Sequence, residues 1–127
     1  MSEFSDQWAG CMHSSGLPVP DVEDANEALE VLDKIHSAWE NAGGEAELTI
    51  GALLATGLLT VAGGAVVPVL EEIVTVTVAA YLGACIGCLG SVAYDSLKSL
   101  FASGQLPAFV VAELESQGVD IQNEAVA

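Results

Sequence analysis

A chain of 127 residues with 18 aspartates and glutamates but only two lysines or arginines has a formal net charge of −16 at pH 7. Nucleic acid is not expected as a partner, because phosphate binding requires clustered cations. The same chain is 52% hydrophobic and has a mean hydropathy of +0.53, so one small domain must keep its acidic and apolar parts apart.

Residues 1–20 are expected to form a flexible acidic arm. Serine, glycine and proline are frequent here, and Pro18 and Pro20 disfavour helix. The start has no basic region and no early apolar run, so we expect no signal peptide. Synthesis in the cytoplasm and secretion by a leaderless route follow as expectations. Cys11 and His13 are two potential metal ligands, but nothing nearby completes a site.

Residues 21–44 predict an amphipathic helix. Its apolar positions recur at steps of three and four, and comprise Ala25, Ala28, Leu29, Leu32, Ile35, Trp39 and Ala42. Asp24 followed by Glu27 resembles a capping box at the start. The glycine pair at residues 43 and 44 suits the end, because glycine accepts the left-handed conformation. The apolar stripe needs a cover, and the next segment is the expected partner.

Residues 45–104 predict a hydrophobic helical hairpin with a C-terminal extension. Between Glu47 and Asp95 the only charges are Glu71 and Glu72, which divide a first apolar segment (residues 48–70) from a second (residues 73–94). A bilayer core of about 30 Å needs about 20 apolar residues per helix, so each segment is long enough to span once. Pro68, Glu71 and Glu72 then form the hairpin tip. A β-hairpin over residues 66–78 is the rival reading, because β-branched residues are frequent there.

Small residues recur every fourth position in both apolar segments and define a glycine zipper. Such ridges let helix backbones approach closely within lipid. The ridge residues are Ala52, Thr56, Thr60 and Gly64 in the first segment, and Ala79, Gly83, Gly87 and Ser91 in the second. The threonines at 56, 60, 75 and 77 could line a pore, or could bond to their own helix backbone. The alternative reading is a hairpin buried in a soluble bundle.

Residues 105–127 predict a short helix, opened by Pro107 and ended by Gly118, and a polar tail. The predicted fold is therefore all-α, a small bundle of about four helices around the central hydrophobic hairpin.

Residues that could support catalysis or bind a cofactor are few. Cys85 and Cys88 form a CxxC pair, but within an apolar helix cysteine packs as a small hydrophobe. A disulfide between these two cysteines is the less favoured alternative. Glu71 and Glu72 could form an acid/base pair, but a charged hairpin tip explains them better. We expect no enzyme activity, no metal and no cofactor.

A family resemblance follows from these residues. The Gly83-x-x-x-Gly87 zipper, flanked by Ala79 and Ser91, lies in a small acidic chain and resembles the small membrane-depolarising effectors of bacterial type VI secretion. The likeness covers residues 48–94. It implies a pore-forming antibacterial toxin, acting at the inner membrane of a target cell. It also implies a secretion tube protein as carrier and a cognate immunity protein.

The lipid bilayer is thus the first expected partner. A single hairpin encloses no channel, so a homo-oligomer in the membrane is expected too. Two other classes stay open: a soluble helical adaptor, immunity protein or chaperone, and a small integral membrane protein of the holin-like kind.

Overall fold

The computed structural model describes residues 3–59 and 67–121, and within these ranges the chain is all-α, as predicted. Seven α-helices occur there: α1 (Glu3–Ser14), α2 (Ala25–Asn41), α3 (Ile50–Ala55), α5 (Val67–Leu70), α6 (Val78–Val92), α7 (Tyr94–Ala102) and α8 (Ala108–Ser116). A 3-10 turn, Glu71–Ile73, follows α5. The described ranges contain no strand, only an isolated antiparallel bridge between Thr49 and Thr77.

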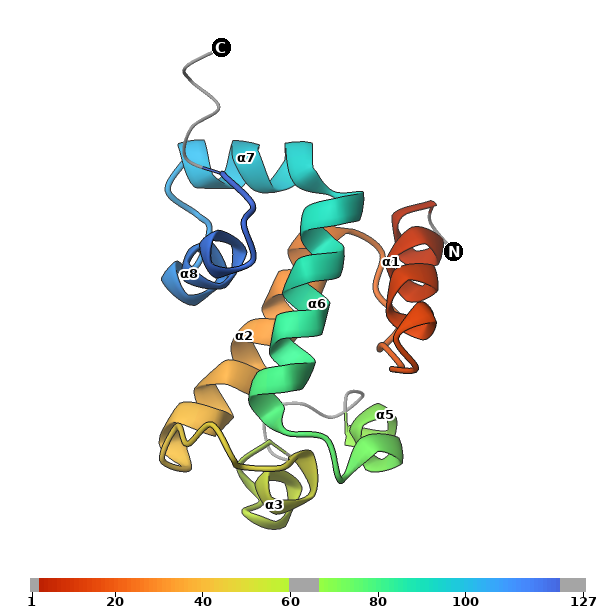
Figure 1. Cartoon of the computed structure of the whole chain (residues 1–127), viewed down its shortest axis with the longest axis vertical. Helices are drawn as coiled ribbons and strands as arrows, with labels where there is room; N and C mark the ends of the chain where they lie inside the picture. Colours follow the sequence, from red (N-terminus) through yellow and green to blue (C-terminus); the bar gives the residue numbers. More distant parts are fainter. Residues whose placement is uncertain (1–2, 60–66, 122–127) are drawn as a thin grey trace.

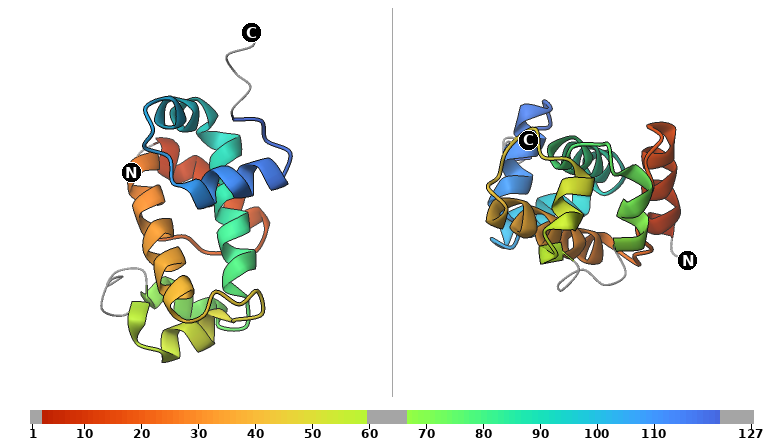
Figure 2. Two further views of the ribbon diagram at one scale, coloured as in Figure 1. Left: turned by 90° about the vertical axis from the view of Figure 1, so that its left-hand side faces the viewer. Right: turned by 90° about the horizontal axis from the view of Figure 1, so that it is seen from below.

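Helix α6 lies at the centre of this arrangement (Figure 1). Helices α1, α2 and α8 pack against α6, while α3 and α5 lie near its N-terminal end (Figures 1 and 2). Helix α7 leaves the C-terminal end of α6 at an angle of 98°. In the part of the chain that the structure describes, the bundle is therefore built around one long helix, α6, and not around the predicted helical hairpin.

The apolar composition of α6 explains its place. A helix that is apolar all round must be covered on every side, and the 15 residues of α6 include no charged side chain. Its buried residues are Val78, Tyr81, Leu82, Cys85, Ile86, Cys88 and Leu89. They belong to one hydrophobic core, which also takes in Trp8 and Met12 of α1, Leu32 and Ile35 of α2, and Val110 and Leu114 of α8.

Helix α2 matches the amphipathic helix predicted for residues 21–44. Its apolar stripe faces the core, with Leu32 and Ile35 fully buried. The Asp24 side chain caps the helix by accepting a hydrogen bond from the Glu27 amide at 2.9 Å. The Glu27 carboxylate accepts from the Glu23 amide at 2.8 Å, so the capping box is displaced by one residue. Gly43 and Gly44 end the helix with φ of 117° and 65°.

The flexible arm expected for residues 1–20 is wrong over α1. Phe4, Trp8, Cys11 and Met12 share one face of this helix, and Trp8 and Met12 are fully buried against the core. Burial of this face stabilises the helix, and the prolines do not break it because they lie beyond its end, in the link to α2.

The first apolar segment (residues 48–70) does not form the long helix that the predicted hairpin requires. Helix α3 has only six residues, and Gly57 follows it with a φ of 78°. The Thr56 hydroxyl donates to the Leu53 carbonyl at 2.6 Å, which completes the turn at this break. Left-handed backbone at a glycine interrupts the helix after one and a half turns.

The second arm of the predicted hairpin, with its C-terminal extension, is also divided into separate helices. Helix α5 and the 3-10 turn precede α6, and Thr77 caps α6 by accepting a hydrogen bond from the Ala80 amide at 3.1 Å. At the far end the helix stops at Ala93, whose backbone has φ −136° and ψ 33°, and α7 begins in a new direction. The second arm of the predicted hairpin and its extension to residue 104 therefore do not form one continuous helix, because the Thr77 cap and the bend at Ala93 separate α5, α6 and α7.

Candidate functional site: helix α6 and its covers

The glycine-zipper face of α6 lies beneath α8. The Gln117 side chain, which follows α8, donates to the Gly83 carbonyl and to the Glu113 carboxylate, both at 2.8 Å. A Cβ atom added at Gly87 would lie 2.5 Å from the Gln117 side-chain oxygen, and one added at Gly83 would lie 3.3 Å from the Glu113 carboxylate. In this state the small residues admit polar side chains from α8 within the same chain.

The other ridge residues have different surroundings. Ala79 is half-buried at the edge of the same face, whereas Ser91 is exposed. In the first apolar segment Ala52 and Thr56 are exposed. Thr60 and Gly64 lie outside the described residues. The structure therefore brings Ala79, Gly83 and Gly87 together under α8 and does not pack Ala52 or Thr56 against them.

The residues predicted to form the hairpin tip lie in a short helix and a 3-10 turn. Pro68 lies in α5, and Glu71 and Glu72 occupy the 3-10 turn, with all three side chains exposed. The two apolar segments meet where α3 and α6 begin, because the Ile50 amide donates to the Val76 carbonyl at 2.7 Å and the Val78 amide donates to the Leu48 carbonyl at 2.9 Å. The contact between the segments is thus a short backbone pairing and not a pair of long helices.

A groove of about 270 Å³ opens between α2, α6 and α8. It is lined by His36, Trp39, Ala79, Leu82, Ile86, Phe109, Ala112, Glu113 and Ser116. The His36 ring stacks on the Phe109 ring, with centroids 3.9 Å apart and an angle of 4° between the planes. This stacking joins α2 to α8 on the outer side of α6.

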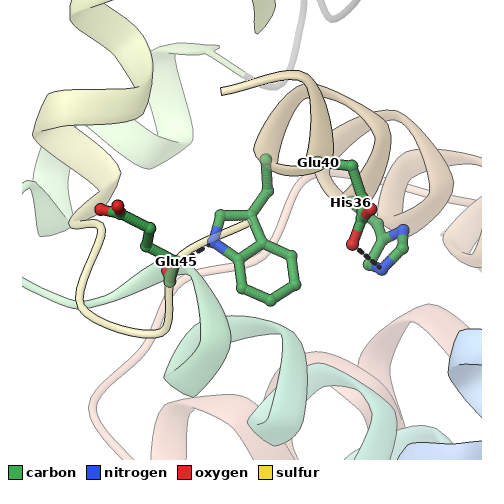
Figure 3. A network of polar contacts seen from close by, with 4 residues as sticks. His36, Glu40 and Glu45 are labelled. Atoms are coloured by element: carbon green, nitrogen blue, oxygen red, sulfur yellow. Dashed lines mark hydrogen bonds and ion pairs between the residues drawn. The ribbon is translucent and has the colours of Figure 1, made fainter. Parts of the chain in front are cut away.

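The polar groups beside this groove belong to the C-terminal end of α2 (Figure 3). The His36 Nε2 atom lies 3.7 Å from the Glu40 carboxylate, and the Trp39 indole donates to the Glu45 carbonyl at 2.8 Å. Trp39 is only half-buried and packs against the edge of the core. The buried members Leu29, Leu32 and Ile35 provide the cover from α2.

Helix α1 is joined to α6 by a disulfide between Cys11 and Cys88, two residues separated by 77 positions in the sequence. One turn earlier on both helices the Trp8 indole donates to the Cys85 carbonyl at 3.2 Å. The interpretation of Cys88 as a simple packing residue is therefore wrong, and so is a disulfide within the CxxC pair. The four-residue steps of Phe4, Trp8 and Met12 were a helix signal that could have revealed α1; nothing in the sequence indicates which cysteine pairs with Cys11.

Cys85 is the free cysteine of the described chain, and it is buried. Burial raises the pKa of its thiol to about 12, and a hydrogen bond with the Tyr81 side chain opposes part of this rise. Burial also raises the pKa of Tyr81, and the neighbouring Cys85 adds to the increase. The Tyr81 hydroxyl donates to the Pro18 carbonyl at 2.8 Å. At neutral pH both groups are uncharged, so Cys85 is a poor nucleophile.

Among residues 3–59 and 67–121 no group of three or more His, Cys, Asp or Glu side chains is placed to hold a metal ion. Across the same ranges no single helix is both long and apolar enough to cross a membrane, although the bent pair Val78–Val92 and Tyr94–Ala102 meets the length and composition requirement together.

Comparison of the chain with protein-family models, with curated proteins and with solved structures finds no match.

Proposed function

We propose that this chain is a pore-forming antibacterial toxin, which inserts into and depolarises the inner membrane of a target cell. The observation that carries the proposal is the position of α6: a helix without any charged residue forms the centre of a chain whose formal net charge is −16. In water, α1, α2 and α8 cover this helix. In a bilayer, lipid would replace them.

In the proposed mechanism α8 leaves the glycine face of α6, and this also exposes Val110 and Leu114, which are buried in the core in water. The contact of α8 with the glycine face is made by the polar side chains of Gln117 and Glu113, and Gln117 is exposed. Exposed hydrogen bonds contribute little net stability, since water replaces them at small cost. Removal of α8 would free a face on which Gly83 and Gly87 let another helix approach closely. A second copy of α6 is the proposed occupant of that face in the membrane.

A membrane span requires more than α6 alone. Fifteen helical residues extend about 22 Å, less than the roughly 30 Å of a bilayer core. The inserted helix must therefore lengthen, and straightening the bend at Ala93 would add α7. The resemblance to type VI effectors extends the proposal to a tube protein as carrier and to an immunity protein in the producing cell. No catalytic role is proposed.

The test is dye release from liposomes, combined with membrane flotation. Gly83→Ile with Gly87→Ile adds bulk to the zipper face, so this variant should float with lipid but release less dye than the wild type. The matched control, Glu113→Ala with Gln117→Ala, loosens α8 and leaves α6 unchanged, so it should release dye faster. Equal release by all three proteins would contradict the proposal. Expression of the chain with export to the periplasm should collapse the membrane potential of the host bacterium.

A specific observation favours a second candidate, a helical adaptor or immunity-type protein. The apolar side chains of α6 are accommodated inside the chain, and no buried side-chain polar atom of the described residues lacks a hydrogen-bond partner. Such a protein has no need of a bilayer. Under this candidate the wild type and both variants would leave liposomes intact.

A further inference from the structure

Helix α1 differs from the other covers of α6 because a covalent bond secures it. The Cys11–Cys88 disulfide and the hydrogen bond from Trp8 to the Cys85 carbonyl occupy successive turns of both helices. Trp8 and Met12 are fully buried in this contact. The α1 helix thus covers one side of α6 through a covalent bond, whereas α8 is held by the buried side chains of Val110 and Leu114 and by the polar contacts of Gln117 and Glu113.

Without its contacts to α6, α1 would not persist. It has 12 residues, and isolated helices of about 12–15 residues or fewer are marginal in water. Beyond it, the chain reaches α2 through a link that contains Pro18 and Pro20 and is anchored to α6 by the Tyr81 hydroxyl. The disulfide is therefore the strongest constraint that keeps α1 in place, since it is the one bond that thermal motion cannot open.

We propose that the Cys11–Cys88 disulfide is a redox-controlled catch, which holds α1 over α6 while it is closed and frees α1 when a dithiol reduces it. The consequence for membranes rests on the proposed function: the surface uncovered by α1 is then the surface that enters the bilayer.

The chemistry of opening is a two-electron exchange. A thiolate of the dithiol attacks the Cys11 sulfur, the more accessible end, because Cys11 is half-buried whereas Cys88 is only 7% exposed. The Cys11–Cys88 bond breaks, Cys88 leaves as a thiolate and takes up a proton, and a mixed disulfide forms at Cys11. The second thiol of the reagent then attacks the mixed disulfide. Cys11 is released as a thiol, and the reagent leaves as a cyclic or paired disulfide.

Cys85 does not open the catch from within. It lies three residues before Cys88 on α6 and is fully buried. Its thiol stays protonated at neutral pH because burial raises its pKa to about 12, and a protonated thiol does not attack a disulfide. The catch therefore responds to an external dithiol and not to spontaneous exchange with the third cysteine.

The first experiment measures release of α1 without any membrane. In a Trp39→Phe background Trp8 is the single tryptophan, and its emission should shift to longer wavelength when dithiothreitol is added and the freed thiols are alkylated. Amide exchange of α1 and of the α6 turn around Cys85 should accelerate by about tenfold or more, with α2 and the α2–α6 contact still protected. Cys85→Ala should respond like the wild type, whereas Cys11→Ala with Cys88→Ala should already be open and indifferent to the reagent.

The outcomes separate the catch from the proposed function. Unchanged Trp8 emission and exchange after reduction would overturn the catch, and so would a loss of protection across α2 and α8 as well, since the disulfide would then be a general support of the fold. Release of α1 together with dye release from liposomes several times faster than that of the oxidised protein supports both. Release of α1 with no dye release in either redox state supports the catch and overturns the membrane function. If the double alanine variant fails to fold, the reduced and alkylated wild type supplies the open state.

Discussion

The first and second apolar segments have similar lengths and compositions but reach different structures. Within its described residues the first segment makes two short helices, the six-residue α3 and the four-residue α5, and Ala52 and Ala55 of α3 are exposed. The second makes the 15-residue α6, with seven of its residues buried. Helices α3 and α6 both begin with a threonine cap, at Thr49 and at Thr77. What differs is the ending: a left-handed Gly57 stops α3, whereas α6 continues to Ala93.

Apolar composition therefore determines how much side-chain surface must be buried, but it does not determine which segment forms the long helix. Backbone conformation at one glycine and the availability of covering helices make that choice. Helix α6 has α1, α2 and α8 around it, whereas α3 lies mainly beside α5 and the 3-10 turn that follows it. Substitutions that act on one segment at a time test whether the two segments differ in this way.

Truncation of a buried leucine on α6 should destabilise the chain most, and truncation of an exposed leucine in the first segment is the matched comparison. Leu89 on α6 is fully buried, whereas Leu58 in the first segment is 40% exposed. Leu89→Ala should lower the free energy of unfolding by about 3–5 kcal/mol, because it removes core contacts and leaves a cavity. Leu58→Ala should change it by no more than about 0.5 kcal/mol. Urea unfolding followed by circular dichroism measures both, and equal losses would show that the segments are equally buried.

Raising the pH should lower the free energy of unfolding through groups of the second segment alone. The buried groups with raised pKa values, Tyr81 and Cys85, both lie on α6. The Cys85 pKa rises from 9.0 to about 12 on folding, so below pH 9 its contribution is complete, and between about pH 9 and pH 12 the unfolded chain binds fewer protons. Stability should then fall by about 1.4 kcal/mol per pH unit.

Tyr81 should add to this slope above about pH 10, its ordinary pKa. Urea unfolding of the oxidised protein at intervals from pH 8 to pH 10.5 measures the slope. Cys85→Ala is the control and should flatten it below pH 10. A wild type whose stability stays constant to pH 10.5 would show that these groups are not buried as described.

A smaller effect is expected where the first segment turns. Gly57 has a φ of 78°, so Gly57→Ala should destabilise the chain by about 1 kcal/mol through left-handed strain. Gly10 is the matched control: it lies inside α1, and an added Cβ would meet nothing within 4 Å. Gly10→Ala should stabilise by about 0.5–1 kcal/mol. Thermal unfolding of both variants gives the comparison, and a stabilised Gly57→Ala would mean that α3 can continue through this residue.

The smallest effect concerns the glycine face of α6. Gly87→Ala gains helix propensity but forces the Gln117 side chain away from Gly83, so its net effect should be near zero. In a Gln117→Ala background the same change should stabilise by about 0.5–1 kcal/mol. A double-mutant cycle measures this coupling. Absence of coupling would place Gln117 away from Gly87 in solution.

The sequence predicted the features that depend on local pattern. The stripe of α2, its Asp24 cap, and the short helix α8 before Gly118 all appear, because amphipathic spacing and terminal residues act over one or two turns. The packing of helices on the zipper face in a membrane stays a prediction. In the structure the side chains of Glu113 and Gln117 approach Gly83 and Gly87, and the spacing could not specify them, since small residues admit any neighbour.

The sequence did not predict the features that depend on contacts between residues far apart in the chain. Helix α1 depends on burial of Trp8 against α6, and the disulfide joins cysteines 77 positions apart, so no local pattern contains either. The break at Gly57 depends on a backbone conformation that glycine permits but does not require.

The disulfide also gives the chain a covalent topology. Residues 11–88 form a closed ring that contains α2, α3, α5 and most of α6, while α7 and α8 belong to an open tail. A protease that cuts once between Cys11 and Cys88 leaves the two fragments joined, and they separate on a gel only after reduction. A cut at the exposed Gly104, by contrast, breaks the covalent link to α8 whether or not the disulfide is closed, so that only noncovalent contacts then hold α8 on the glycine face, while α1 stays covalently attached to α6.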